Sequence, residues 1–115
     1  ILYISVNIEG LSRDKEEILA SICEQKKCQI LCIQETHKGN RSKRPEIRGM
    51  KLLIERPHDK YGSVIFSNID LQINNVSCSE ENNIEILSVG MSNSVIIHQF
   101  TNRRKSGSTT QKPVV

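Results

Sequence analysis

The feature that most constrains the fold is a short, uninterrupted apolar run over residues 29–33, which ends at Gln34. A run of this length without alternating polar positions is typical of a strand that is covered on both faces. Residues 2–8 alternate between apolar and mixed positions, which indicates a half-buried strand. The sequence between the two segments is helical in character. Because strand, helix and strand in succession form a parallel crossover, we expect the chain to open as a β-α-β unit.

The helix between these strands carries its own start and stop signals. Ser12 can cap its N-terminus, and acidic residues crowd the first turn, where the helix dipole favours negative charge. Lys26 and Lys27 follow near the other end, where the dipole favours cations. Helical spacing predicts that one buried face is formed by Leu11, Ile18, Leu19 and Ile22.

The rest of the chain lacks helical periodicity. Short segments rich in β-branched residues are separated by turn residues, and they predict strands at 50–55, 62–67, 71–76, 84–89 and 94–99. The expected fold class is therefore α+β, with a β-α-β start followed by antiparallel strands. We expect residues 1–100 to form the domain and residues 101–115, which are polar, basic and aperiodic, to be a disordered tail.

The charge distribution and the cysteine content indicate which partners and which compartment to expect. The net charge is +3, but residues 38–48 hold five cations and one acid, and residues 103–112 hold four cations and no acid. Basic loops beside an acidic body favour a partner such as DNA, although each loop alone is also consistent with a solvated surface. The four cysteines lack zinc-knuckle spacing and are expected to be reduced thiols in an intracellular protein. No apolar run is long enough to predict a membrane span.

Polar side chains follow both strands of the expected β-α-β unit. Asn7 and Glu9 follow the first strand, and Glu35 and His37 follow the second. Parallel neighbouring strands end at the same edge of a sheet, so these side chains should lie close together. Carboxylate and amide oxygens suit Mg²⁺. The alternative interpretation is that Glu35 only begins a solvated loop.

The identity of these residues carries a family resemblance. Asn7-Ile8-Glu9-Gly10-Leu11 and the later Gln34-Glu35-Thr36-His37 resemble the first two motifs of the endonuclease/exonuclease/phosphatase superfamily. The resemblance is strongest to the apurinic-type endonuclease domain of non-LTR (LINE-like) retrotransposons, and it extends over about residues 2–97. It implies a two-sheet sandwich that nicks DNA by Mg²⁺- or Mn²⁺-dependent phosphodiester hydrolysis, with intact relatives acting in the nucleus.

The resemblance also implies roles for individual residues. Glu35 matches the metal-ligand glutamate, Asn7 matches the asparagine that orients the site and contacts the scissile phosphate, and Glu9 is a second candidate metal ligand. Gln34 and His37 would support the loop. The basic segment supplies candidate DNA contacts at Lys38, Arg41, Lys43 and Arg44.

Later motifs of that family have no counterpart in this sequence. Neither an Asp-x-Asn nor a Ser-Asp-His segment occurs, and after residue 97 the chain departs from the family pattern. The expectation is therefore an N-terminal fragment, a half-sandwich with one sheet face uncovered. We expect it to be inactive alone and to associate through uncovered strand edges. Two alternatives stay open: a repair nuclease or phosphatase of the same superfamily, and a non-catalytic nucleic-acid-binding remnant.

Overall fold

The computed structural model describes residues 2–91 and 95–102. In these ranges the chain forms seven strands and one helix. Their order along the chain is β1 (Tyr3–Asn7), α1 (Arg13–Lys26), β2 (Ile30–Gln34), β3 (Met50–Arg56), β4 (Ser63–Asn68), β5 (Ile73–Glu81), β6 (Ile84–Met91) and β7 (Ile96–Asn102). The α+β class expected from the sequence is confirmed.

The predicted β-α-β start is confirmed as well. Strands β1 and β2 are parallel neighbours, in a register that places Tyr3 beside Ile30 and Asn7 beside Gln34. Every residue of β2 from Ile30 to Ile33 is buried, as an uninterrupted apolar run predicts. Side chains of β1 alternate between half-buried and exposed, which fits a strand at the edge of its sheet.

Helix α1 begins as predicted, and its predicted buried face is correct in part. The Ser12 hydroxyl accepts a hydrogen bond from the Lys15 amide, so Ser12 is the N-cap. The predicted face is wrong at Ile18, which is 58% exposed. Leu11 and Leu19 are buried as predicted, although Leu11 precedes the helix, and Ile22 is half-buried. The residues of α1 that are buried follow the spacing of a helical face: Glu16, Leu19, Ala20 and Cys23.

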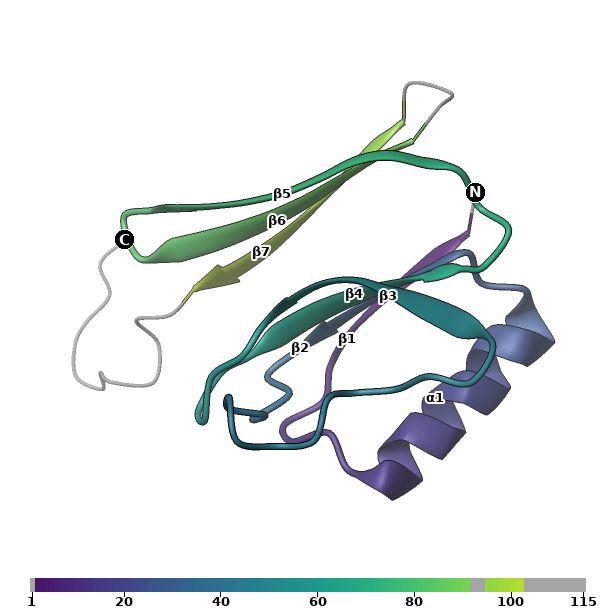
Figure 1. Cartoon of the computed structure of the whole chain (residues 1–115), viewed down its shortest axis with the longest axis horizontal. Helices are drawn as coiled ribbons and strands as arrows, with labels where there is room; N and C mark the ends of the chain where they lie inside the picture. The colour runs from purple at the N-terminus through teal and green to yellow at the C-terminus, as the bar shows by residue number, and fades with distance from the viewer. Residues whose placement is uncertain (1, 92–94, 103–115) are drawn as a thin grey trace.

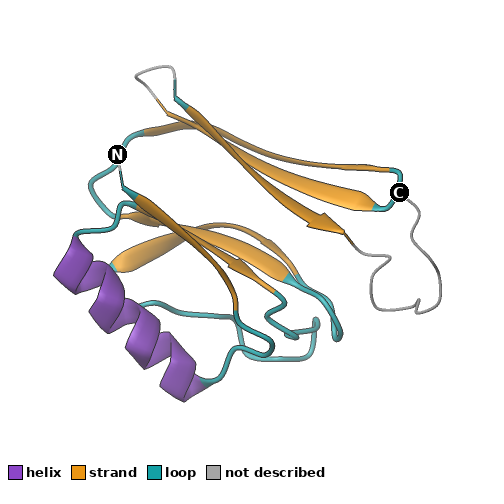
Figure 2. Cartoon of the chain, turned by 180° about the vertical axis from the view of Figure 1, so that it is seen from behind, coloured by secondary structure: helices purple, strands orange, loops and turns teal. Residues whose placement is uncertain are grey.

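Two sheets and the helix form three layers. One sheet has the strand order β1-β2-β4-β3 and the other has the order β5-β6-β7. In Figure 1, α1 lies below the four-stranded sheet and the three-stranded sheet lies above it. Figure 2 shows the same layers from behind. At 14 residues and with many charged side chains, the helix in the described part of the chain cannot span a membrane.

Each interface between layers has its own apolar cluster. The first joins α1 to the four-stranded sheet and includes Leu19, Leu31 and Phe66. The second lies between the sheets and includes Ile65 and Leu87. The four-stranded sheet is therefore packed on both faces within the described residues. We expected a half-sandwich with one bare sheet face; that expectation is wrong for this sheet, because the hairpin strands β5–β7 fold back over it.

Some strand boundaries differ from the prediction. Strands β3, β4 and β6 match it within two residues at each end. Strand β5 starts and ends later than the predicted 71–76, because its partner β6 pairs with it as far as Glu81. Strand β7 continues through Thr101 and Asn102, which we had assigned to the tail, because they pair with β6. Residues 94 and 103–115 lie outside the described residues.

The outer face and one edge of the three-stranded sheet remain uncovered in the described structure. Ile96 and Phe100 of β7 are 60% and 57% exposed, and β7 pairs only with β6 there. The strand has no Lys, Arg, Asp or Glu in its sequence, which are the residues that commonly protect an edge from pairing with another chain.

We therefore expect concentration-dependent self-association, measurable by sedimentation velocity over a series of protein concentrations. Substituting Phe100→Lys should reduce it, because a charge on an exposed edge opposes strand pairing. The exposed β5 position Ser79→Lys is the matched control. A chain that stays monomeric at all concentrations, or equal effects of the two lysines, would contradict the assignment to β7.

Candidate functional site

The loops that leave β1 and β2 are joined to each other by backbone hydrogen bonds. The Ile8 amide donates to Gln34 O (3.0 Å), the Gly10 amide to Glu35 O (2.7 Å), and the Leu11 amide to Thr36 O (2.8 Å). These bonds continue the parallel pairing of the two strands beyond their ends. The loop that holds Asn7 and Glu9 and the loop that holds Glu35 therefore form one rigid edge.

Several residues of this edge adopt an unusual backbone conformation. Glu9, Glu35 and His37 have φ angles of 48°, 57° and 58°, and Gly10 has a φ angle of 99°. Non-glycine residues in the left-handed region are uncommon and each costs about 1–3 kcal/mol, and such residues cluster at functional sites. Three of the six described non-glycine residues with positive φ fall in these two short loops. No pattern in the sequence indicated these conformations.

The structure brings the predicted site residues to one sheet edge. Asn7 lies beside Gln34 in register, and Glu35 follows directly. The Glu35 side chain is mostly buried, at 14% exposure, and its carboxylate lies 3.9 Å from Nε2 of His37. Glu9 is exposed on the adjoining loop. A half-buried carboxylate beside an exposed amide can bind a hard cation or orient a phosphate.

Gln34 links this edge to the second sheet. Its side-chain amide donates to the carbonyl oxygen of Phe100 in β7 (2.9 Å). The Ser63 and Thr101 hydroxyls also meet across the sheets (3.2 Å), and Arg56 pairs with the buried Glu85 (2.8 Å). The supporting role expected of Gln34 thus acts between sheets, not within its loop. Because the acceptor of Gln34 is a backbone carbonyl, the side chains of β7 carry no sequence signal for this contact.

The loop after β2 rests on the turn between β3 and β4. Thr36 N donates to Gly62 O (3.0 Å), and His37 N donates to Tyr61 O (2.7 Å). His58 stabilises the turn, because its Nδ1 accepts hydrogen bonds from the amides of Lys60 (3.0 Å) and Tyr61 (3.2 Å). The turn thus fixes the backbone at Thr36 and His37, directly after Glu35.

Lys15 supports the first loop from the helix. Its ammonium donates to the carbonyl oxygens of Ile8 (2.9 Å) and Gly10 (3.0 Å). These carbonyls flank the strained Glu9, so the lysine holds the turn in place while adding a positive charge near the candidate site. The sequence analysis did not single out Lys15; its position three residues after the helix cap was the only available signal.

The cations of the basic segment after the site differ in their contacts within the chain, although Arg44 is itself exposed like Arg41 and Lys43. Arg44 pairs with the mostly buried Glu55 and donates to Gly39 O (2.7 Å), so it braces the segment. Lys38 is half-buried, while Arg41 and Lys43 are exposed. Our four candidate DNA contacts are therefore not equivalent, since Arg44 would have to leave an internal ion pair to meet a phosphate.

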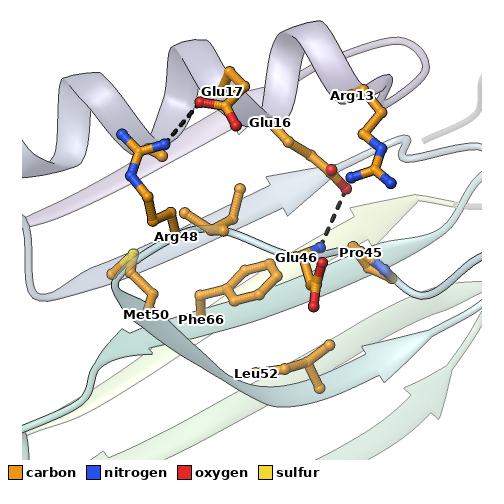
Figure 3. Close-up of a pocket in the computed structure, with 11 residues that line it drawn as sticks. Arg13, Glu16, Glu17, Pro45, Glu46, Arg48, Met50, Leu52 and Phe66 are labelled. Atoms are coloured by element: carbon orange, nitrogen blue, oxygen red, sulfur yellow. Dashed lines mark hydrogen bonds and ion pairs between the residues drawn. The ribbon is translucent and has the colours of Figure 1, made fainter.

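A recess of the described surface lies away from the candidate site. It has a volume of about 380 Å³ and is formed between α1, β3, β4 and residues 45–48. Figure 3 shows Phe66 and Met50 in this recess, with the Glu16 carboxylate directed at the backbone amide of Glu46 and Arg48 paired with Glu17. None of its lining residues belongs to the two site loops, so the recess is separate from the candidate site.

The described residues contain no preformed cluster of metal ligands. In residues 2–91 and 95–102, no three His, Cys, Asp or Glu side chains are grouped as a complete metal site. Cys23 and Cys32 are buried, and burial raises the pKa of each thiol to about 12, so neither is a thiolate at neutral pH. Both cysteines are therefore buried core residues with little thiolate available to bind a metal.

Comparisons with known proteins leave the family open. No protein-family model matches this chain, and no curated protein does either. The function is therefore inferred from the residues and their geometry alone.

Proposed function

We propose that this chain is part of a metal-dependent nuclease domain of the endonuclease/exonuclease/phosphatase kind, similar to those of non-LTR retrotransposons. The observation that carries the proposal is the edge formed by the interlocked loops after β1 and β2. It unites Asn7 with Glu35, the residues that the resemblance assigns to phosphate and metal binding. Two elements far apart in sequence supply them, as expected when side chains act together at the ends of parallel strands.

The donor atoms at this edge fit Mg²⁺ or Mn²⁺ in kind. Mg²⁺ usually retains several waters and takes one or two carboxylates together with substrate phosphate oxygens. Glu35 would be the first carboxylate ligand and Glu9 the second. A bound cation would neutralise charge on the phosphate and lower the pKa of a bound water. The exposed position of Glu9 leaves it free to approach a cation that Glu35 holds.

The chain's own residues would bind and orient the substrate. Asn7 offers an amide that can donate to a phosphate oxygen, and Lys15 adds positive charge behind the same loop. The His37 ring lies close to the Glu35 carboxylate and restricts its orientation. The group that positions and deprotonates the attacking water is not among these residues, and general-base catalysis requires one. The sequence also lacks the Asp-x-Asn and Ser-Asp-His motifs that the resemblance associates with this task.

We therefore expect the 115-residue chain alone to have no nuclease activity but to retain weak metal binding. The purified chain with Mg²⁺ should nick supercoiled plasmid no faster than a Glu35→Gln chain prepared in parallel, which controls for contaminating nuclease. Titration with Mn²⁺, followed by paramagnetic broadening of the NMR signals of residues 7–10 and 35–37, should show broadening that Glu35→Gln removes. Nicking that depends on Glu35 would contradict the proposal that the chain lacks essential catalytic groups. Broadening unaffected by Glu35→Gln would contradict the metal site.

The exposed cations of the basic segment should contribute to DNA affinity without selectivity for sequence. Replacing Arg41 and Lys43 together by alanine should reduce the slope of log affinity against log salt by about one to two units, because fewer phosphate counterions are released. Fluorescence anisotropy with a labelled duplex at several salt concentrations measures this slope.

Arg44→Ala is the matched control for that experiment. It removes one cation from the same segment, but it also leaves the mostly buried Glu55 without its partner. The expected result is a loss of about 1–3 kcal/mol of folding stability, the cost of an unsatisfied buried group, with a smaller change in salt slope. An Arg44→Ala effect confined to DNA binding would show that the guanidinium contacts phosphate.

A second candidate function is nucleic-acid binding without catalysis. The missing downstream motifs favour it, as does the basic segment beside an edge that holds the candidate phosphate-binding residue Asn7. The two functions differ in what happens when the missing catalytic groups are supplied. A catalytic edge gains activity that depends on Glu35, whereas a binding edge gains none.

A further inference from the structure

The C-terminus of α1 folds back on itself through a left-handed residue. Lys27 has a φ angle of 57°, its amide donates to Glu24 O (3.3 Å), and the Cys28 amide donates to Cys23 O (2.9 Å). In this type of helix ending, the residue after the left-handed position packs against the residue five positions earlier. That contact is normally apolar. Here both positions are cysteine.

The two cysteines are neighbours at this helix ending. The bond from the Cys28 amide to Cys23 O brings the two residues together, and Cys28 Sγ donates to the carbonyl oxygen of Ile30 (2.9 Å). Both residues are almost fully buried, at 5% and 3% exposure, and both belong to the apolar cluster beneath α1. Cys32 belongs to the other cluster, between the sheets. The helix ending therefore sets one pair of thiols apart from the rest.

We propose that Cys23 and Cys28 are a site of reversible oxidation that reacts with small-molecule disulfides and closes as an intramolecular disulfide. This inference is independent of the nuclease proposal. One cysteine thiolate attacks a sulfur of the small disulfide, whose S–S bond breaks and releases one thiol after proton uptake. The second cysteine then attacks the mixed disulfide and releases the second thiol. The pair loses two electrons and two protons, and the small disulfide is reduced to two thiols.

The fold stabilises the intramolecular disulfide but does not accelerate its formation. Burial raises the pKa of Cys23 to about 12, so the reactive thiolate is scarce at neutral pH and the exchange is slow. Once formed, the mixed disulfide has a second thiol held beside it, which gives a high effective concentration for ring closure. The intramolecular disulfide therefore prevails over the mixed disulfide at equilibrium. It ties the end of α1 to the start of β2.

Equilibration of the full chain in buffers of reduced and oxidised glutathione tests this proposal. The chain is held at mildly alkaline pH without oxygen until its intact mass is constant, then quenched with acid, alkylated and mapped by peptide mass. We expect one disulfide, between Cys23 and Cys28. Its half-oxidation point should require a glutathione buffer at least about tenfold more reducing than for the same chain in urea, a difference of about 30 mV.

The urea sample keeps the same sequence separation, so the comparison isolates the contribution of the fold. A variant with Cys32→Ser and Cys78→Ser should behave like the original chain, while Cys23→Ser should form only the mixed disulfide. Mapping of the unaltered chain keeps the test valid even where a variant unfolds. A stable mixed disulfide in the original chain, a bond to Cys32, or equal oxidation with and without urea would each overturn the proposal.

Discussion

Gly62→Ala should destabilise the chain by about 3–5 kcal/mol, most of the stability of a small domain. Gly62 has a φ angle of 92°, and a Cβ there would lie 2.2 Å from Thr36 Oγ1 and 3.3 Å from the carbonyl oxygen of His58. The conformation disfavours any side chain, and the space holds none. Urea denaturation followed by circular dichroism measures the loss.

Gly49→Ala is the control, because it separates the cost of the backbone conformation from the cost of the steric clash. Its φ angle is 86°, but a Cβ there meets no atom within 4 Å. It should cost only about 1–2 kcal/mol, the price of the left-handed conformation. Thr36→Ala should partly rescue Gly62→Ala by removing the nearest clash, since the buried Thr36 hydroxyl has no hydrogen-bond partner to lose. Equal losses at the two glycines would refute the close approach of the turn to the Glu35–His37 loop.

Local patterns were sufficient to predict the elements that position the candidate site. The apolar run of β2 and the Ser12 cap each depend on neighbouring residues, so they can be read directly from sequence. The meeting of Asn7 and Glu35 followed from the rule that parallel strands end at one edge. The predictions were wrong where tertiary contacts determine which side chains are buried. The buried side of α1 is set by the sheet beneath it, and Leu11, which seemed to begin that face, lies outside the helix.

Interactions between sheets could not be predicted from spacing. The bond from Gln34 to Phe100 joins residues 66 positions apart, and the pairing of Arg56 with Glu85 depends on how the two sheets overlie. Counting charges was also insufficient to predict which cations form ion pairs within the chain. Arg41 and Arg44 cannot be distinguished by their positions in the sequence. In the structure Arg44 forms an ion pair with Glu55 of β3. Which charged side chains form ion pairs can be determined only from the three-dimensional structure.

Glu35→Gln should abolish most catalysis once the missing catalytic groups are supplied. In a hybrid that joins residues 1–97 of this chain to the downstream half of an intact retroelement endonuclease, the expected loss of turnover is on the order of 10²–10³-fold. Glutamine keeps the size and hydrogen bonding of glutamate but removes the charge that binds a hard cation. Mg²⁺-dependent nicking of plasmid under single-turnover conditions measures the chemical step.

Two further variants of the hybrid make this result specific. Glu81→Gln removes an exposed carboxylate at the C-terminal end of β5, outside the two site loops, and should leave turnover unchanged. The paired change Arg41→Ala with Lys43→Ala should weaken DNA binding while bound substrate is cleaved at nearly the original rate, because these cations lie on the segment beyond the site loops. Higher Mg²⁺ concentration should not restore Glu35→Gln fully, since a ligand has been lost. If Glu35→Gln reduced only DNA affinity and the cation pair abolished turnover, the roles assigned to the two regions would be reversed, and the metal site would have to lie elsewhere.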